Sequence, residues 1–172
     1  MNITVLAVGT KMPRWVNEAV AEYAKRFGRD IRYVLKEIKP EKRGAGVGAE
    51  QGMAAEEKRI LEAVPNGAYL VVLDERGKAP TSVELAEYLR IWQADGKHVC
   101  FVIGGADGMT DYLKQQAGLM LRLSSLTLPH GARFIDGAAL SGSVDFEQSS
   151  VSSGIGRRFC PISAALRNCG CF

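Results

Sequence analysis

Two segments of the sequence combine residue types and spacing that suit a small-molecule site. The first is the run Gly104-Gly105-Ala106-Asp107-Gly108, which directly follows an apolar segment. Glycine lets a ligand approach the backbone closely because no Cβ intervenes, but the same glycines suit a tight turn from a strand into a helix. The run is not GxGxxG, and no Gly-Lys-Ser/Thr follows it, so a dinucleotide or triphosphate site is poorly supported.

The second segment, Leu123-Ser124-Ser125-Leu126-Thr127-Leu128-Pro129-His130, mixes apolar and hydroxyl side chains after another apolar stretch. Its backbone amides and carbonyls could frame an adenine or a thioether. An ordinary strand exit is the alternative. His130 is one of only two histidines. Because no Ser or Cys partner can be assigned to it, a structural hydrogen bond is the simpler role.

Positive charge is concentrated in the first quarter of the chain, although the whole chain carries only +3. Such side chains could contact the phosphates of an RNA. Acidic residues are interspersed among them, however, and a solvated surface is the alternative. The basic residues in question are Lys11, Arg14, Lys25, Arg26, Arg29, Lys39, Lys42 and Arg43.

Composition limits the class of protein that can hold these segments. The chain has 172 residues, 47% of them apolar, which suits one compact domain and excludes wholesale disorder. No apolar run is long enough for a transmembrane span, and the N-terminus lacks the basic head of a signal peptide. The four cysteines include no CxxC pair, so a zinc site is not expected. We therefore expect a cytoplasmic protein with reduced thiols.

Hydrophobic periodicity predicts strands that alternate with helices. Strands are predicted at 2–8, 31–38, 68–74 and 98–103, and an apolar stretch begins at 119. Helices are predicted from Pro13 to Gly28, around 53–64, from a Thr81/Glu84 capping box to Gly96, and over 110–117. In the third of these helices, four apolar side chains are predicted to face the core: Val83, Leu85, Leu89 and Trp92. Cys100 should be a small buried apolar residue. This alternation is typical of an α/β domain with a mostly parallel sheet flanked by helices.

A parallel sheet gathers the carboxyl ends of its strands at one edge, and ligands bind there. Three such ends stand out in the sequence: Leu73-Asp74, Gly104-Gly105 and the segment 124–128. The residues by themselves therefore predict a ligand pocket at three strand ends.

These same segments resemble a known family. The motifs LAVGTKMPRWV (6–16), AEYAKRF (21–27), LDERGK (73–78), FVIGGADGM (101–109) and LSSLTLPH (123–130) are similar, in order and spacing, to those of the bacterial large-subunit ribosomal RNA pseudouridine N3-methyltransferases. The resemblance covers residues 1 to about 131. That family is the smallest kind of SPOUT methyltransferase, in which the C-terminal part of the α/β domain is threaded as a trefoil knot.

The resemblance implies an activity, a cofactor and partners. The family uses S-adenosyl-L-methionine to methylate N3 of a pseudouridine in 23S rRNA on the assembled ribosome, and it works as a homodimer. Neither DNA nor a membrane is an expected partner. By position, the resemblance implies a cofactor site formed by Leu73, Gly104, Leu123, Ser124, Ser125, Leu126, Thr127 and Leu128. It assigns no catalytic base within residues 1–131.

The resemblance stops abruptly after His130-Gly131. The family continues with a helix bearing Glu-Gln-x-Tyr-Arg and ends in Pro-Tyr-His-Arg, whereas residues 132–172 contain no Lys and three of the four Cys. Codons allowed for residues 132–156, shifted by one base, can spell ARVLLTEQLYRAASILNNHPYHRE, which is the missing ending. We therefore expect a methyltransferase domain over 1–131 and a frameshifted tail over 132–172. That tail would leave completion of the knot and the activity of this chain in question.

Two other functions remain open at this point. One is a non-catalytic RNA- or ribosome-binding module that keeps the basic residues but does not bind S-adenosyl-L-methionine. The other is an enzyme that binds a nucleotide phosphate at Gly104-Gly105.

Overall fold

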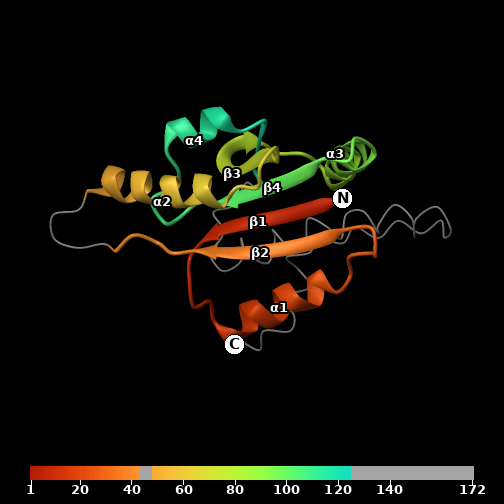
Figure 1. The fold of residues 1–172 in the computed structure, drawn as a ribbon, viewed down its shortest axis with the longest axis horizontal. Helices are drawn as coiled ribbons and strands as arrows, with labels where there is room; N and C mark the ends of the chain where they lie inside the picture. Colours follow the sequence, from red (N-terminus) through yellow and green to blue (C-terminus); the bar gives the residue numbers. More distant parts are fainter. Residues whose placement is uncertain (43–47, 125–172) are drawn as a thin grey trace.

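A computed structural model describes residues 1–42 and 48–124 of the chain. Within these residues strands and helices alternate (Figure 1), as the periodicity predicts. In chain order the elements are β1 (Asn2–Val8), α1 (Arg14–Ala24), β2 (Arg32–Ile38), α2 (Ala49–Ala63), β3 (Tyr69–Lys78), α3 (Ser82–Ala94), β4 (His98–Ile103), α4 (Asp111–Gln116) and β5 (Leu119–Leu121).

The strands form one five-stranded sheet in the order β2-β1-β4-β3-β5, and every neighbouring pair is parallel. The predicted α/β class with a parallel sheet is therefore confirmed. Strand β4 and residues 69–73 of β3 lie inside the sheet and are apolar on both faces, while β2 lies at one edge and carries exposed charged residues.

The sheet is covered by helices on both faces, and alternate strand residues supply two separate cores. In one core, strand residues such as Val5 and Phe101 pack against α1 and α3. Helix α3 contributes Leu89 and Trp92 to this core. The other packs Val72 and its neighbours against α2 and α4. Figure 1 shows α1 on one side of the sheet and α2 and α4 on the other. Cys100 is fully buried in the second core, as predicted, and burial raises the pKa of its thiol to about 12.

Local sequence signals set the helix ends. The predicted capping box is present: the Thr81 side chain accepts a hydrogen bond from the Glu84 amide, and the Glu84 carboxylate accepts one from the Thr81 amide. The prediction that Val83 points inward is wrong, since Val83 is 60% exposed. At about 100° per residue Val83 lies on the opposite side of α3 from Trp92, which is buried against the sheet.

Strand β3 is longer than the predicted segment 68–74, because it continues to Lys78 after an irregularity at residues 74–77. After β5, the structure describes three more residues, Arg122, Leu123 and Ser124. The predicted trefoil knot and the predicted tail over 132–172 lie outside the described residues.

Candidate functional site

The carboxyl ends of β4, β3 and β5 lie next to one another in the sheet. Leu73 at the end of the regular part of β3 pairs with Ile103 of β4 on one side and with Leu121 of β5 on the other. Gly104 directly follows Ile103, and Leu123 follows Leu121 by two residues. The fold therefore brings Leu73, Gly104, Leu123 and Ser124 to one edge of the sheet, while Ser125, Leu126, Thr127 and Leu128 lie outside the described residues.

The side chains at this edge are mostly covered by apolar neighbours. Leu73 is 6% exposed and belongs to the core under α1 and α3, and the half-buried Leu123 packs against the same core. Ser124 is also half-buried. The side chains at this edge are therefore mainly apolar, and the backbone amides and carbonyls after the strands are its main polar groups.

The glycine-rich run after β4 forms a tight turn that closes on itself. The Gly108 amide donates to the Gly105 carbonyl at 3.2 Å, and Gly108 has a φ of 90°, which favours glycine. A Cβ at Gly104 would lie 2.6 Å from Met109 Cγ and 2.9 Å from the Gly108 carbonyl oxygen. The packing of the turn therefore requires glycine at 104, and backbone contact with a ligand remains a prediction.

Two carboxylates of α2 lie beside this turn and the residues that follow it. Glu56 Oε2 lies 2.6 Å from the position that a Cβ on Gly105 would take, and Glu56 Oε1 accepts a hydrogen bond from the Glu41 amide at 2.9 Å. Glu57 accepts a hydrogen bond from the Thr110 hydroxyl, which in turn caps α4 by accepting from the Leu113 amide. A carboxylate beside Gly105 repels a phosphate, so this geometry disfavours the nucleotide-phosphate alternative.

An ion pair lies directly after Leu73. Lys114 Nζ of α4 is 2.9 Å from Asp74 Oδ2, and the side chains are only 19% and 8% exposed, respectively. Asp74 Oδ1 also accepts a hydrogen bond from the Arg76 amide at 2.9 Å. Burial raises the pKa of the Asp74 carboxyl, but the hydrogen bonds from Lys114 and the Arg76 amide outweigh it, so the pKa lies below its ordinary value. The pair ties the end of β3 to α4.

Residues 74–77 form a bulge that also contacts β5. Leu73 and Lys78, on either side of the bulge, both pair with Leu121, and the Arg122 amide donates to the Lys78 carbonyl at 2.7 Å. A Cβ at Gly77 would lie 2.6 Å from both the backbone N and C of Leu121. The bulge is thus packed directly on the β5 backbone, from which Leu123 and Ser124 emerge.

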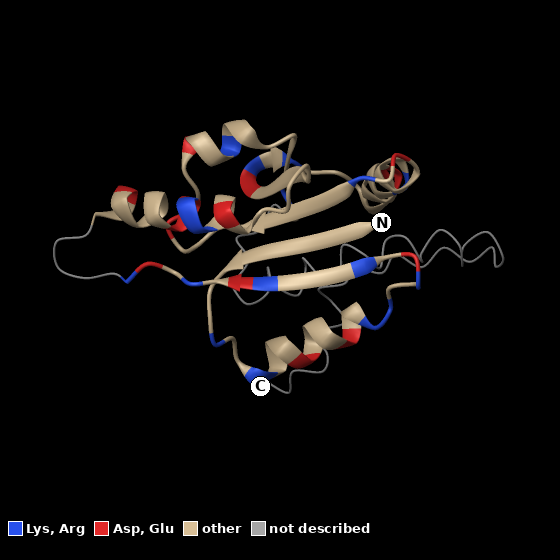
Figure 2. Ribbon diagram, in the orientation of Figure 1, with Lys and Arg blue, Asp and Glu red and all other residues tan. Residues whose placement is uncertain are grey.

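The structure divides the basic residues of the first quarter into two groups. Arg14 on α1 and Lys25 directly after it each lie 2.6 Å from a carboxylate of this helix, that of Glu18 and of Glu22, respectively. The others that the structure describes are exposed and, within the described residues, form no ion pair: Lys11, Arg26, Arg29, Lys39 and Lys42. Figure 2 shows blue segments at both ends of β2 and on the adjoining loops. Arg43 lies outside the described residues.

Comparison with known proteins identifies the family of this chain. A family model described as "Predicted SPOUT methyltransferase" matches residues 1–134. The chain belongs to the SPOUT methyltransferase family. A protein of Neisseria meningitidis serogroup C, named Ribosomal RNA large subunit methyltransferase H, is 86% identical over 131 residues, which is 76% of this chain and 84% of the relative. Proteins of the same name from Neisseria gonorrhoeae and Chromobacterium violaceum are 85% and 66% identical over the same shares.

Membership of the SPOUT family confirms the resemblance read from the motifs. Three contacts near the candidate site were not predicted from the sequence. They are the Asp74–Lys114 ion pair, the contacts of Glu56 and Glu57 beside the glycine turn, and the packing of Gly77 on β5. Asp74 and Gly77, which make the first and third of these contacts, both lie within the LDERGK motif (73–78). The motif marked these residues as features of the family but did not predict their contacts. Across residues 1–42 and 48–124 there is no cluster of potential metal ligands and no helix that could cross a membrane.

Proposed function

We propose that this SPOUT protein transfers a methyl group from S-adenosyl-L-methionine to 23S ribosomal RNA. The observation that carries the proposal is the alignment of three strand ends, with Leu73 paired to both Ile103 and Leu121. It brings four of the residues implied by the motifs, Leu73, Gly104, Leu123 and Ser124, to the carboxyl edge of the sheet, where α/β proteins bind ligands. The names of the relatives support rRNA as the substrate.

The residues at this edge suit the proposed methyl donor. Leu73 and Leu123 supply apolar surface, and the backbone at Gly104 and Ser124, with residues 125–128, would supply hydrogen bonds to its polar groups. When bound, S-adenosyl-L-methionine would present an electrophilic methyl group. The acceptor, N3 of a pseudouridine, must lose its proton and be held in line with that methyl. Positioning should therefore supply much of the rate, and no described residue is assigned as the base.

Further parts of the proposal rest on the family resemblance. They are a homodimeric enzyme, action on the assembled ribosome, and a cytoplasmic location. A C-terminal trefoil knot belongs to the same set, since it would be formed by residues beyond 124.

The departure after residue 131 calls for a separate proposal. We infer that residues 132–172 are read in a shifted frame, and the 131-residue span shared with each relative supports this. Sequencing the source DNA across codons 125–140 tests it. A gene that encodes the Tyr-Arg and Pro-Tyr-His-Arg ending would confirm the frameshift. A gene that encodes residues 132–172 as printed, from independent isolates, would overturn it.

Binding of the methyl donor can be measured by its effect on thermal unfolding. A ligand at about 100 times its Kd stabilises the native state by about 2.7 kcal/mol. For a domain of this size, that should raise Tm by roughly 5–10 °C. We expect S-adenosyl-L-methionine to give such a shift and ATP and NAD to give none. A shift with ATP or NAD instead would favour the nucleotide-phosphate alternative.

Methyl transfer itself separates an enzyme from a non-catalytic RNA-binding module. The assay combines the purified chain with radiolabelled S-adenosyl-L-methionine and ribosomes from a strain that lacks the modification. The meningococcal relative serves as the positive control. We expect label at N3 of a pseudouridine in 23S rRNA, at a reduced rate if the tail is frameshifted. A chain that binds RNA but neither binds nor consumes the methyl donor would be the non-catalytic module.

A further inference from the structure

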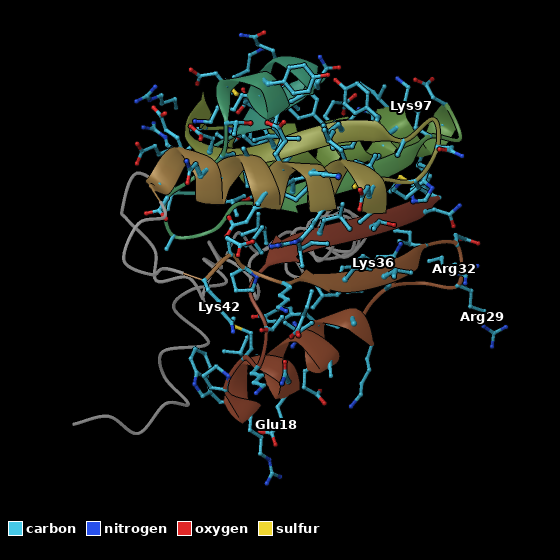
Figure 3. All side chains as sticks on the ribbon, turned by 60° about the vertical axis from the view of Figure 1, so that its left-hand side comes forward. Glu18, Arg29, Arg32, Lys36, Lys42 and Lys97 are labelled. Carbon is cyan, nitrogen blue, oxygen red and sulfur yellow. The ribbon has the colours of Figure 1, made fainter. Side chains whose placement is uncertain are left out.

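Strand β2 forms one edge of the sheet, and the strand together with the loops at its two ends carries basic side chains that the proposed methyl-donor site does not use. We define the basic edge as Arg29, Arg32, Lys36, Lys39 and Lys42, all of which are exposed. Figure 3 shows Arg29 and Arg32 at one end of β2, Lys36 along it and Lys42 beyond its other end. We propose that the basic edge binds the phosphate backbone of the RNA substrate, an inference that rests on the proposed function.

The charges of the basic edge are available to an external anion. Within the described residues, none of its five side chains forms an ion pair. Asp30, Glu37 and Glu41 are the acidic residues along the same stretch, and the Glu41 carboxylate is paired with Arg59 of α2. Glu37 lies next to Lys36 in sequence, so its side chain projects from the opposite face of the strand. The basic side chains on and directly after α1 differ, because the carboxylates of Glu18 and Glu22 already offset Arg14 and Lys25.

The spacing along β2 suits an extended polyanion. Arg32 and Lys36 are four residues apart on the same face, which at about 3.3 Å per residue places their Cα atoms roughly 13 Å apart. Because an extended strand runs in one direction, basic side chains along it lie in a row. The basic edge is therefore a line of charge rather than a pocket, which suits contact with successive phosphates.

The basic edge also leads toward the methyl-donor site. Lys39 directly follows the carboxyl end of β2, and the Gly9 amide donates to the Ile38 carbonyl there at 2.8 Å, joining the exits of β1 and β2. Only β1 separates β2 from β4, the strand that ends at Gly104. At about 4.8 Å between neighbouring strands, β2 and β4 lie roughly 10 Å apart. An RNA strand that follows the basic edge would thus arrive at the edge of the sheet where Leu73 and Gly104 lie.

An RNA fits this surface better than an anionic membrane does. A protein that lies on a membrane inserts large apolar side chains beside its basic ones. The exposed large apolar residues of the described parts are on the helices, and none is on β2. They are Trp15, Leu61, Val83, Ile91 and Tyr112.

The test compares two double variants that lower the net charge equally. Arg32→Gln/Lys36→Gln neutralises two residues of the basic edge, and Arg14→Gln/Lys25→Gln neutralises the two residues that already have carboxylate partners. The probe is fluorescently labelled ribosomes from a strain that lacks the modification, and binding is titrated from about 50 to about 200 mM KCl. We expect the first variant to bind roughly 10-fold more weakly and its slope of log K against log salt to fall by about 2.

The control variant should keep the wild-type slope, and both variants should keep the wild-type affinity for S-adenosyl-L-methionine. Equal slopes for wild type and Arg32→Gln/Lys36→Gln would overturn the assignment of the basic edge and leave the proposed function intact. The same would hold if the variant lost affinity for anionic vesicles and not for the ribosomes. Wild-type protein that binds neither the ribosomes nor the methyl donor would overturn the proposed function as well.

Discussion

Replacing Lys114 by methionine is expected to lower the free energy of unfolding by about 2 kcal/mol. The substitution keeps most of the apolar stem but removes the ammonium that lies 2.9 Å from Asp74. The Asp74 carboxylate, only 8% exposed, would then remain buried without its counter-ion. Because the pair ties the end of β3 to α4, affinity for S-adenosyl-L-methionine should fall together with stability. Urea unfolding and calorimetric titration measure the two effects.

The pH dependence of stability provides a second readout of the same pair. The Asp74 pKa is lowered in the folded protein, so its contribution is present above the unfolded pKa and is lost as the pH falls through the folded value. Below about pH 4, wild-type stability should therefore fall more steeply than that of Asp74→Asn. The two curves should differ most near neutral pH, where the ion pair is complete.

An exposed ion pair of the same protein supplies the control. Arg90 and Glu87 on α3 pair with side chains 64% and 49% exposed, so Arg90→Met should cost no more than about 0.5 kcal/mol. If Lys114→Met were as mild as Arg90→Met, the partly buried pair would not be a fixed part of the site. The double variant Asp74→Asn/Lys114→Met should lose less stability than the sum of the two single variants, because it leaves no unpaired charge.

Replacing Gly77 by alanine is expected to have the other large effect. The added Cβ would lie 2.6 Å from backbone atoms of Leu121 and 2.7 Å from the Met120 carbonyl carbon, and a backbone cannot rotate away as a side chain can. Strand β5 would have to move, with a loss of roughly 2–4 kcal/mol. Leu123 and Ser124 leave β5 directly, so the variant should also lose its thermal shift with S-adenosyl-L-methionine.

Gly28 offers a matched alanine substitution, since a Cβ there would have no neighbour within 4 Å. Gly28→Ala should leave stability within about 0.5 kcal/mol of wild type or raise it slightly, because it reduces the freedom of the unfolded chain. Both variants are compared by urea unfolding. If Gly77→Ala were as stable as Gly28→Ala and kept the thermal shift, the close packing of the bulge on β5 would not control the strand exit.

Much of the fold could be predicted from local patterns. The strands at 2–8 and 98–103 coincide with β1 and β4, and the Thr81/Glu84 capping box marks the start of α3. These signals are readable because each depends on neighbours in the sequence: an apolar run of strand length, or two side chains three residues apart. Val83 shows the limit of such patterns, since an apolar residue near a helix end gives no sign of which way it faces.

The proximity of the candidate site residues was predictable because parallel strands place their carboxyl ends at one edge whatever their order. That rule identified Leu73, Gly104 and the segment 124–128 as neighbours, and the motifs LDERGK and FVIGGADGM pointed to the family. It could not give the order of strands, which puts β3 between β4 and β5 and so pairs Leu73 with both Ile103 and Leu121.

The sequence by itself determined the alternation of elements, the helix caps, the glycine turn after β4 and the SPOUT motifs. Each of these follows from residues that are close along the chain. Only the tertiary structure decided that Asp74 meets Lys114, that Glu56 covers Gly105 and that Gly77 rests on the β5 backbone. The partners in each contact are tens of residues apart, so they meet only because both core faces of the sheet must be buried at once, and that packing depends on the whole chain.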